Sequence, residues 1–115
     1  MSRASAAAAV QQARAAAPLF AALGDETRLQ LLLQLSRQGP GSIAQLSAGA
    51  SVSRQAVTKH LQVLADAGYV QDERRGRERV WRLQPRRLED TKQCLNRISR
   101  EWEVALDRLK RFVEA

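Results

Sequence analysis

The sequence predicts a mainly α-helical domain that carries one small β-hairpin and ends in a long C-terminal helix. Three patterns support this fold class. Apolar residues recur at helical spacing in several segments between residues 18 and 67. The spacing then changes to strand-like alternation around an arginine-rich turn at residues 74–77. From residue 88 onwards, apolar residues recur every seven positions, as in helices that pair with other helices.

The length and composition are those of one folded domain. The chain has 115 residues, of which 44% are hydrophobic and only 4% aromatic, so the core must consist mainly of Leu, Val, Ile and Ala. No apolar run approaches the ~18 residues of a membrane span, and Ala6–Ala9 is too short for a secretory signal. We therefore expect a cytoplasmic protein without membrane contact.

The N-terminal extension, residues 1–17, is rich in alanine and poor in large side chains. Alanine favours helix, but a short helix without packing partners is marginal, so we expect residues 1–12 to be frayed or weakly helical. Pro18 suits the first turn of a following helix, which carries Phe20 on its apolar face and ends at Gly24.

A second helix is expected between Asp25, a favourable N-cap, and the breaker at residues 39–41. This helix is apolar on most sides, so we expect it to be buried. The leucines that give it this character are Leu29, Leu31, Leu32, Leu33 and Leu35.

Two further helices and a hairpin complete the domain. Ser42 caps a short helix over residues 43–48, and Ser53 caps a longer one that stops at Gly68. The hairpin turns at residues 74–77, and its return strand presents Trp81 and Leu83 to a core. Two helices joined by a short glycine-containing turn and followed by a basic hairpin make a winged helix-turn-helix, here over residues 18–85.

The last helix, residues 86–115, is expected to mediate dimerisation. Its two seven-residue series begin at Leu88 and at Thr91. The helical part from about residue 86 to residue 113 is ~42 Å long, which is more than this small domain can cover, so pairing with a second chain is favoured over packing on its own domain. The expected dimer interface comprises Leu88, Leu95, Ile98, Trp102, Ala105, Leu109 and Phe112.

The helix after Ser53 has an apolar and a polar side. At 100° per residue, Val57, Leu61 and Leu64 form a buried stripe, and the opposite side is polar. Gln pairs with adenine edges, Lys and Arg suit guanine, and the Thr methyl can contact thymine. A polar solvent-facing side is the alternative, but the helix-turn-helix context favours contact with double-stranded DNA. The candidate residues are Ser53, Arg54, Gln55, Thr58, Lys59 and Gln62.

Positive charge is concentrated in the same region. Residues 54–87 carry nine Lys and Arg against four acids, whereas residues 88–115 balance to zero. Such a concentration indicates a surface that meets a polyanion; a solvated basic face and an anionic membrane are the alternatives. Four arginines around one glycine in the hairpin are expected to contact phosphates or enter the minor groove. They are Arg74, Arg75, Arg77 and Arg79.

Three stretches of the chain resemble signature segments of the ArsR family of regulators. They are residues 23–29 (LGDETRL), 53–61 (SRQAVTKHL) and 76–83 (GRERVWRL). The resemblance implies an early core helix, a recognition helix and a wing at these places. It further implies a homodimeric repressor in a prokaryotic cytoplasm that binds a palindromic operator and is released by a signal, such as an unknown small-molecule effector.

The chain differs from those members of the ArsR family that sense metals through clustered Cys, His and carboxylate side chains. It has one cysteine, Cys94, and one histidine, His60, too few for a thiolate- or imidazole-rich site. We therefore expect no metal site and no cofactor, as in the metal-independent branch of the family. His60 falls beside the buried stripe and is interpreted as structural, with a phosphate contact as the alternative.

Other functional classes are weaker. An enzyme is not expected, because the sequence shows no nucleophile with a base, no paired acids and no phosphate-binding loop. A winged-helix module for RNA or protein binding is one alternative. A redox-responsive regulator is another, if Cys94 meets its counterpart across the dimer axis, although a small apolar filler is the favoured role of this residue.

Overall fold

The computed structural model describes residues 2–114, so Met1 of the expected extension and Ala115 of the expected last helix lie outside the described residues. The elements follow in the order α1 (Arg3–Leu23), α2 (Glu26–Gln38), β1 (Gly41–Ser42), α3 (Ile43–Ser47), α4 (Arg54–Asp66), β2 (Val70–Arg75), β3 (Glu78–Leu83) and α5 (Pro85–Glu114). The predicted class, a mainly helical fold with a hairpin wing, is confirmed.

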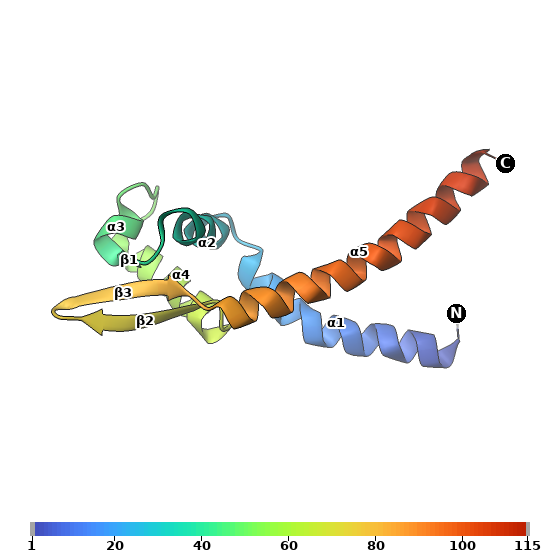
Figure 1. Cartoon of the computed structure of the whole chain (residues 1–115), viewed down its shortest axis with the longest axis horizontal. Coiled ribbons are helices and arrows are strands. Elements are labelled where there is room, and N and C mark those ends of the chain that lie inside the picture. Colours follow the sequence, from blue (N-terminus) through green and yellow to red (C-terminus); the bar gives the residue numbers. More distant parts are fainter. Residues whose placement is uncertain (1, 115) are drawn as a thin grey trace.

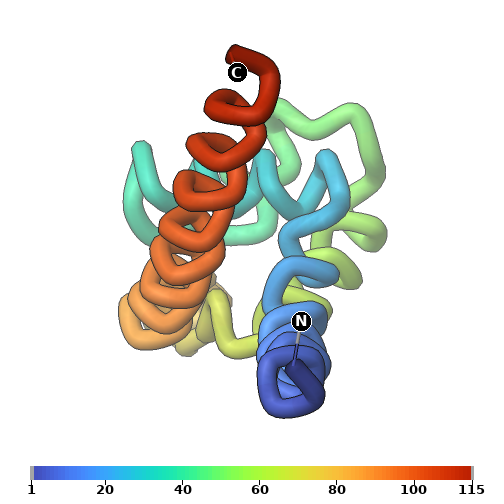
Figure 2. The backbone as a smooth tube through the Cα atoms, turned by 90° about the vertical axis from the view of Figure 1, so that its right-hand side faces the viewer, coloured from blue at the N-terminus to red at the C-terminus, as the bar shows by residue number. Residues whose placement is uncertain are grey.

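The molecule consists of a body with two projecting arms. The helices α2, α3 and α4 and the sheet form the body, and α1 and α5 extend from it in the same direction (Figure 1). The long dimension is 63 Å, against 30 and 21 Å across. Seen from the end of the arms, α1 and α5 are separate columns in front of the body (Figure 2).

The helix α1 is longer than the sequence suggested. It runs from Arg3 to Leu23 and contains Pro18, and the hydroxyl of Ser2 caps its first turn by accepting from Ser5 N at 3.1 Å. The expectations of a frayed N-terminal segment and of a helix that starts at Pro18 are therefore wrong. A reason is that Ala16 is buried, because this part of α1 lies beside α5 and has a packing partner.

Only one side of α2 is buried. Leu31, Leu32 and Leu35 face the core, whereas Leu29 and Leu33 are 46% and 44% exposed. The expectation of a helix buried on most sides is therefore wrong for these two leucines. They are four residues apart and so share the side of α2 that points away from the core.

The predicted helix caps are confirmed. Asp25 accepts from Arg28 N at 3.0 Å, and Ser53 accepts from Ala56 N at 3.1 Å. Ser42 forms a capping box with Gln45, in which each side chain accepts from the other's backbone N–H. These caps place the short turn between α3 and α4 as the sequence indicated.

The sheet has three antiparallel strands in the order β1-β3-β2. The two-residue strand β1 was not predicted; it pairs Ser42 with Val80 on the central strand. Trp81 is fully buried as expected, and Val80, which alternation placed on the outer face, is buried as well. Gly76, with φ 65°, permits the tight turn between β2 and β3.

Tyr69 joins both arms to the body. Its side chain is fully buried, and its hydroxyl lies 2.9 Å from Leu19 O of α1 and 2.8 Å from Thr91 Oγ1 of α5. Thr91, which begins one of the seven-residue series, is thus engaged within its own chain. Leu88, an expected interface residue, also packs against the core cluster of its own chain.

We expect Tyr69→Phe to lower the free energy of unfolding by about 1–3 kcal/mol, because Leu19 O then loses its buried donor. Urea denaturation measures this difference. Ser51→Ala, which removes an exposed hydroxyl, should change it by less than about 0.5 kcal/mol. Equal stability of Tyr69→Phe and the unaltered protein would show that this hydroxyl does not tie the arms to the body.

Candidate nucleic-acid interface

The helix α4, which the sequence predicts to be the recognition helix, presents its polar side to solvent. Val57, Leu61 and Leu64 are fully buried, and Gln55, Lys59 and Gln62 on the opposite side are exposed. The orientation predicted from the sequence is therefore confirmed. Because three fully buried side chains fix the roll of the helix, its outward side chains have a defined direction.

Some polar side chains of α4 form hydrogen bonds within the chain and others do not. The hydroxyl of Ser53 is used in the cap, and that of half-buried Thr58 donates to Arg54 O at 2.9 Å. Gln62 donates to Asp66 Oδ1 at 3.0 Å. Within residues 2–114, the side chains of Arg54, Gln55 and Lys59 have no hydrogen-bond partner, so they are available to an external ligand.

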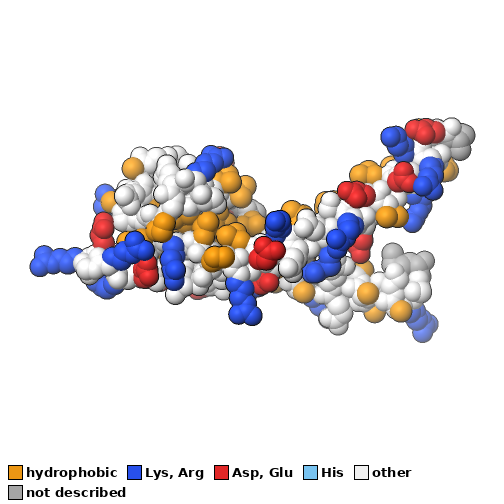
Figure 3. All heavy atoms as spheres, in the orientation of Figure 1, with side chains coloured by type: hydrophobic (Ala, Val, Ile, Leu, Met, Phe, Trp, Pro, Cys, Tyr) orange, Lys and Arg blue, Asp and Glu red, His pale blue; other side chains and the backbone are white. Residues whose placement is uncertain are grey.

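The wing places the four predicted arginines along its outer end. In the register of β2 and β3, Arg74 lies opposite Arg79 and Arg75 lies opposite Glu78. Arg77 lies in the turn. All four residues are exposed. In the space-filling view, Lys and Arg side chains project along the wing, at the end of the molecule away from the arms (Figure 3).

Two of these arginines already have carboxylate partners. Arg75 pairs with Glu73 at 2.8 Å, and Arg79 pairs with Asp72 at 2.6 Å while its guanidinium lies 4.7 Å from the Trp81 ring centroid. The hydrogen bond from Arg79 lowers the pKa of the Asp72 carboxyl, so this carboxylate stays ionised to a lower pH than an ordinary aspartate. Neither Arg74 nor Arg77 has an ion-pair partner in the part of the chain that the structure describes.

His60 lies at the contact between α2 and α4, as the structural interpretation predicted. Its Nδ1 is 3.4 Å from Arg28 Nη1 and 3.7 Å from Asp25 Oδ1. Across residues 2–114, no three His, Cys, Asp or Glu side chains cluster as metal ligands.

Cys94 is buried in its own chain, and so it differs from the arrangement that the redox alternative requires. It is 6% exposed and lines a space between α1 and α5 together with Ala15, Ala16 and Leu19. Cys94 therefore lies next to α1 of the same chain, and its role as a small apolar filler stays a prediction.

The outer part of α5 carries an apolar stripe that its own chain leaves uncovered except at Ile98, which is half-buried and lines a hollow with Ala13 and Ala16 of α1. Trp102 is 60% exposed, and together with Ala105 it lines a shallow hollow of about 340 Å³. At 100° per residue, every residue of this stripe lies within about 80° of Trp102 around the axis of the helix. Leu106 and Val113 broaden the stripe and were missed, because they fall just outside the two seven-residue series. We call this set the arm stripe: Leu95, Ile98, Trp102, Ala105, Leu106, Leu109, Phe112 and Val113.

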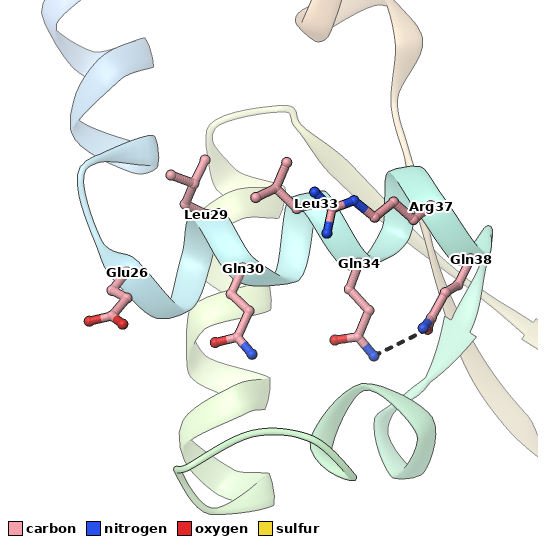
Figure 4. A pocket seen from close by; sticks show the side chains of 7 residues that line it. All are labelled: Glu26, Leu29, Gln30, Leu33, Gln34, Arg37 and Gln38. Carbon is pink, nitrogen blue, oxygen red and sulfur yellow. Dashed lines mark hydrogen bonds between the residues drawn. The ribbon is translucent and has the colours of Figure 1, made fainter.

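A second open groove, of about 480 Å³, runs along the outer side of α2. Leu29, Leu33 and Arg37 form one edge and Gln30, Gln34 and Gln38 the other (Figure 4). Glu26 is its one carboxylate, so the groove lacks the paired acids or the nucleophile with a base that catalysis requires.

None of the helices described for residues 2–114 has the length and apolarity to cross a bilayer.

Comparisons with known proteins agree with this geometry. A family model described as a helix-turn-helix domain matches residues 23–70. The chain is 41% identical over 68 residues to an uncharacterized HTH-type transcriptional regulator of Bacillus subtilis, covering 54% of this chain and 74% of the relative. It is 34% identical over 67 residues to the arsenical resistance operon repressor of Escherichia coli, covering 58% and 57%.

Among solved structures, an ArsR-like transcriptional regulator from a Rhodococcus species is similar to this chain. The identity is 39%, the TM-score is 0.68, and the match covers 84% of this chain and 91% of that one. The similarity therefore includes the body and much of the arms.

Proposed function

Because this chain belongs to the ArsR family of winged helix-turn-helix transcriptional regulators, we propose that it is a homodimeric repressor that reads a palindromic operator through α4. The observation that carries this proposal is the free, outward polar side of α4 opposite three fully buried residues. The relative from Escherichia coli is a repressor by name, which supports repression as the direction of control.

The base-reading residues are those whose side chains are free. The amide of Gln55 can bond an adenine edge in bidentate fashion, and Lys59 suits guanine O6 and N7. Arg54, at the start of α4, can reach a base or a phosphate. Ser53, Thr58 and Gln62 complete the contact surface, with Gln62 first releasing Asp66.

The arm stripe supports a homodimer. An uncovered row of large apolar side chains on a projecting helix is costly in water, and a second copy covers it with the same residues by two-fold symmetry. A two-fold dimer also matches a palindromic operator. We place the protein in the cytoplasm, where operator DNA is accessible.

The proposal is tested by selection from a random-sequence library of duplex DNA. The enriched duplexes should share a symmetric motif whose half-sites are centred about 10 base pairs, or a multiple of that, apart. Gel shift with the enriched duplex and with single-stranded RNA of equal length then compares affinities. Enrichment of no motif, or tighter binding to the RNA, would contradict the proposal and favour an RNA-binding module.

The four wing arginines should contribute unequally to DNA binding. We expect Arg77→Ala to lower the slope of log K against log salt by ~1 per protomer, because a free phosphate contact is lost. Arg79→Ala should lower it by less, since Arg79 must first leave Asp72. The two variants change the net charge equally, so each controls for the other. Equal effects would mean that the carboxylate pairing does not restrain Arg79 on DNA.

We further propose that the effector is not a metal held by thiolates or imidazoles. Micromolar zinc, nickel or cobalt should leave the affinity for the selected duplex unchanged. On two half-sites one helical turn apart, the two His60 residues would lie ~34 Å from each other and could not share an ion. Stoichiometric release of DNA by one of these metals, reversed by a chelator, would contradict this assignment.

A further inference from the structure

Three helices meet at the guanidinium of Arg28. Its Nε donates to Ala22 O at 2.6 Å and its Nη2 to Ala21 O at 3.2 Å, both at the C-terminal end of α1. Its Nη1 lies 3.4 Å from His60 Nδ1 on α4. Because arginine can only donate, the His60 nitrogen is the acceptor in this contact.

The backbone of Arg28 belongs to the same junction. Its N–H donates to Asp25 Oδ1 at 3.0 Å, and this hydrogen bond is the main reason why the pKa of the Asp25 carboxyl is lowered. The guanidinium also offsets the partial negative charge of the last carbonyls of α1. Arg28, whose backbone lies in the first turn of α2, thus caps the end of α1 with its side chain and contacts α4.

Hydrogen bonding concentrates at this residue. Within residues 2–114, Arg28 is the side chain whose hydrogen bonds join α1 to α4. The planar guanidinium holds its donors in fixed directions, so three acceptors on two helices are set relative to one another. The end of α1 also takes part in the core with α4, through Ala22 and Leu23, but apolar packing has no such direction.

We propose that Arg28 is a positioning residue that fixes the angle between α1 and the recognition helix α4. Because α1 lies beside α5, which carries the arm stripe, and Tyr69 bonds to both helices, this angle also sets the distance between the two α4 helices of a dimer on DNA. This inference rests on the proposed function. One base pair moves a half-site by about 3.4 Å and turns it by about 34°. A rigid junction therefore makes the protein discriminate between operators that differ by one base pair in spacing.

The test uses the duplex that the unaltered protein selects and two derivatives with one base pair added or removed between the half-sites. The measured quantity is the ratio of Kd on an altered duplex to Kd on the selected one. Arg28→Met keeps the aliphatic stem and loses the donors, and His60→Leu removes the acceptor on α4 together with the 3.7 Å contact to Asp25. Arg37→Met is the matched control, because it removes the same charge from an exposed position of α2.

We expect Arg28→Met and His60→Leu to lower this ratio at least about fivefold, the low end of measured couplings between sites. Arg37→Met should leave the ratio within about twofold, and the base preference within each half-site should not change in any variant. Thermal unfolding, monitored for each variant, sets a temperature at which all are folded; if Arg28→Met has none, His60→Leu decides.

Three results would overturn the inference while the proposed function stands. The first is an unchanged Kd ratio in both His60→Leu and Arg28→Met. The second is an equal fall of the ratio in Arg37→Met, which would indicate a charge effect. The third is a lack of spacing preference in the unaltered protein. Failure of the unaltered protein to select any duplex refutes the proposed function and the inference together.

Discussion

Replacing Trp102 with glutamate is expected to convert a dimer into a monomer at micromolar protein and to abolish binding to a two-half-site duplex. Trp102 lies at the centre of the arm stripe and is 60% exposed in the single chain. Burying its exposed part, on the order of 100 Å², stabilises the dimer by about 2.5 kcal/mol per copy. Losing both copies raises the dimer dissociation constant by about 10³-fold or more.

Val104→Glu is the matched control for this substitution. Val104 is 59% exposed on the same turns of α5 but lies about 160° from Trp102 around the helix. Sedimentation equilibrium should show a dimer for Val104→Glu and a folded monomer for Trp102→Glu, with circular dichroism reporting the helix content of each. A dimer in the Trp102 variant would mean that the arm stripe is not the interface.

Alanine substitution of Gln55 and of Lys59 is expected to change base preference, with little change in affinity for unrelated DNA. Each residue has a free side chain on the outward side of α4, and a good base contact discriminates by about 1–3 kcal/mol. Each variant should therefore lose about 10- to 100-fold of its preference at one symmetric pair of positions.

The controls for these two variants are Gln93→Ala and Lys92→Ala, which remove the same side-chain types from exposed positions of α5. Selection with each variant should enrich the motif of the unaltered protein in the controls and a motif degenerate at one position in the α4 variants. Identical motifs from all four proteins would show that these residues do not read bases.

Local signals allowed much of the fold to be predicted. The caps at Asp25, Ser42 and Ser53 each satisfy an N–H three residues away, so they depend on short stretches of chain. The direction of the polar side of α4 followed from the helical period, because burial of Val57, Leu61 and Leu64 leaves one orientation.

The sequence was less informative where distant segments meet. The ion pair of Arg79 with Asp72 depends on the register of β2 against β3. The sequence alone therefore did not show which wing arginines have a carboxylate partner. Leu88 and Thr91 share the seven-residue pattern of the arm stripe, but Thr91 meets Tyr69 of its own chain. The extent of α1 depends on its packing beside α5, and the contact between Arg28 and His60 joins residues 32 positions apart in the sequence.

Methylation interference on the selected duplex tests the central claim, that α4 reads the major groove, most directly. Guanine N7 lies in the major groove and adenine N3 in the minor groove, so methylation of each reports a different surface. Methylated N7 within both half-sites should block binding of the unaltered protein, and interference at any guanine read by Lys59 should disappear in Lys59→Ala. Interference confined to adenine N3, or none at N7 in either half-site, would contradict the account.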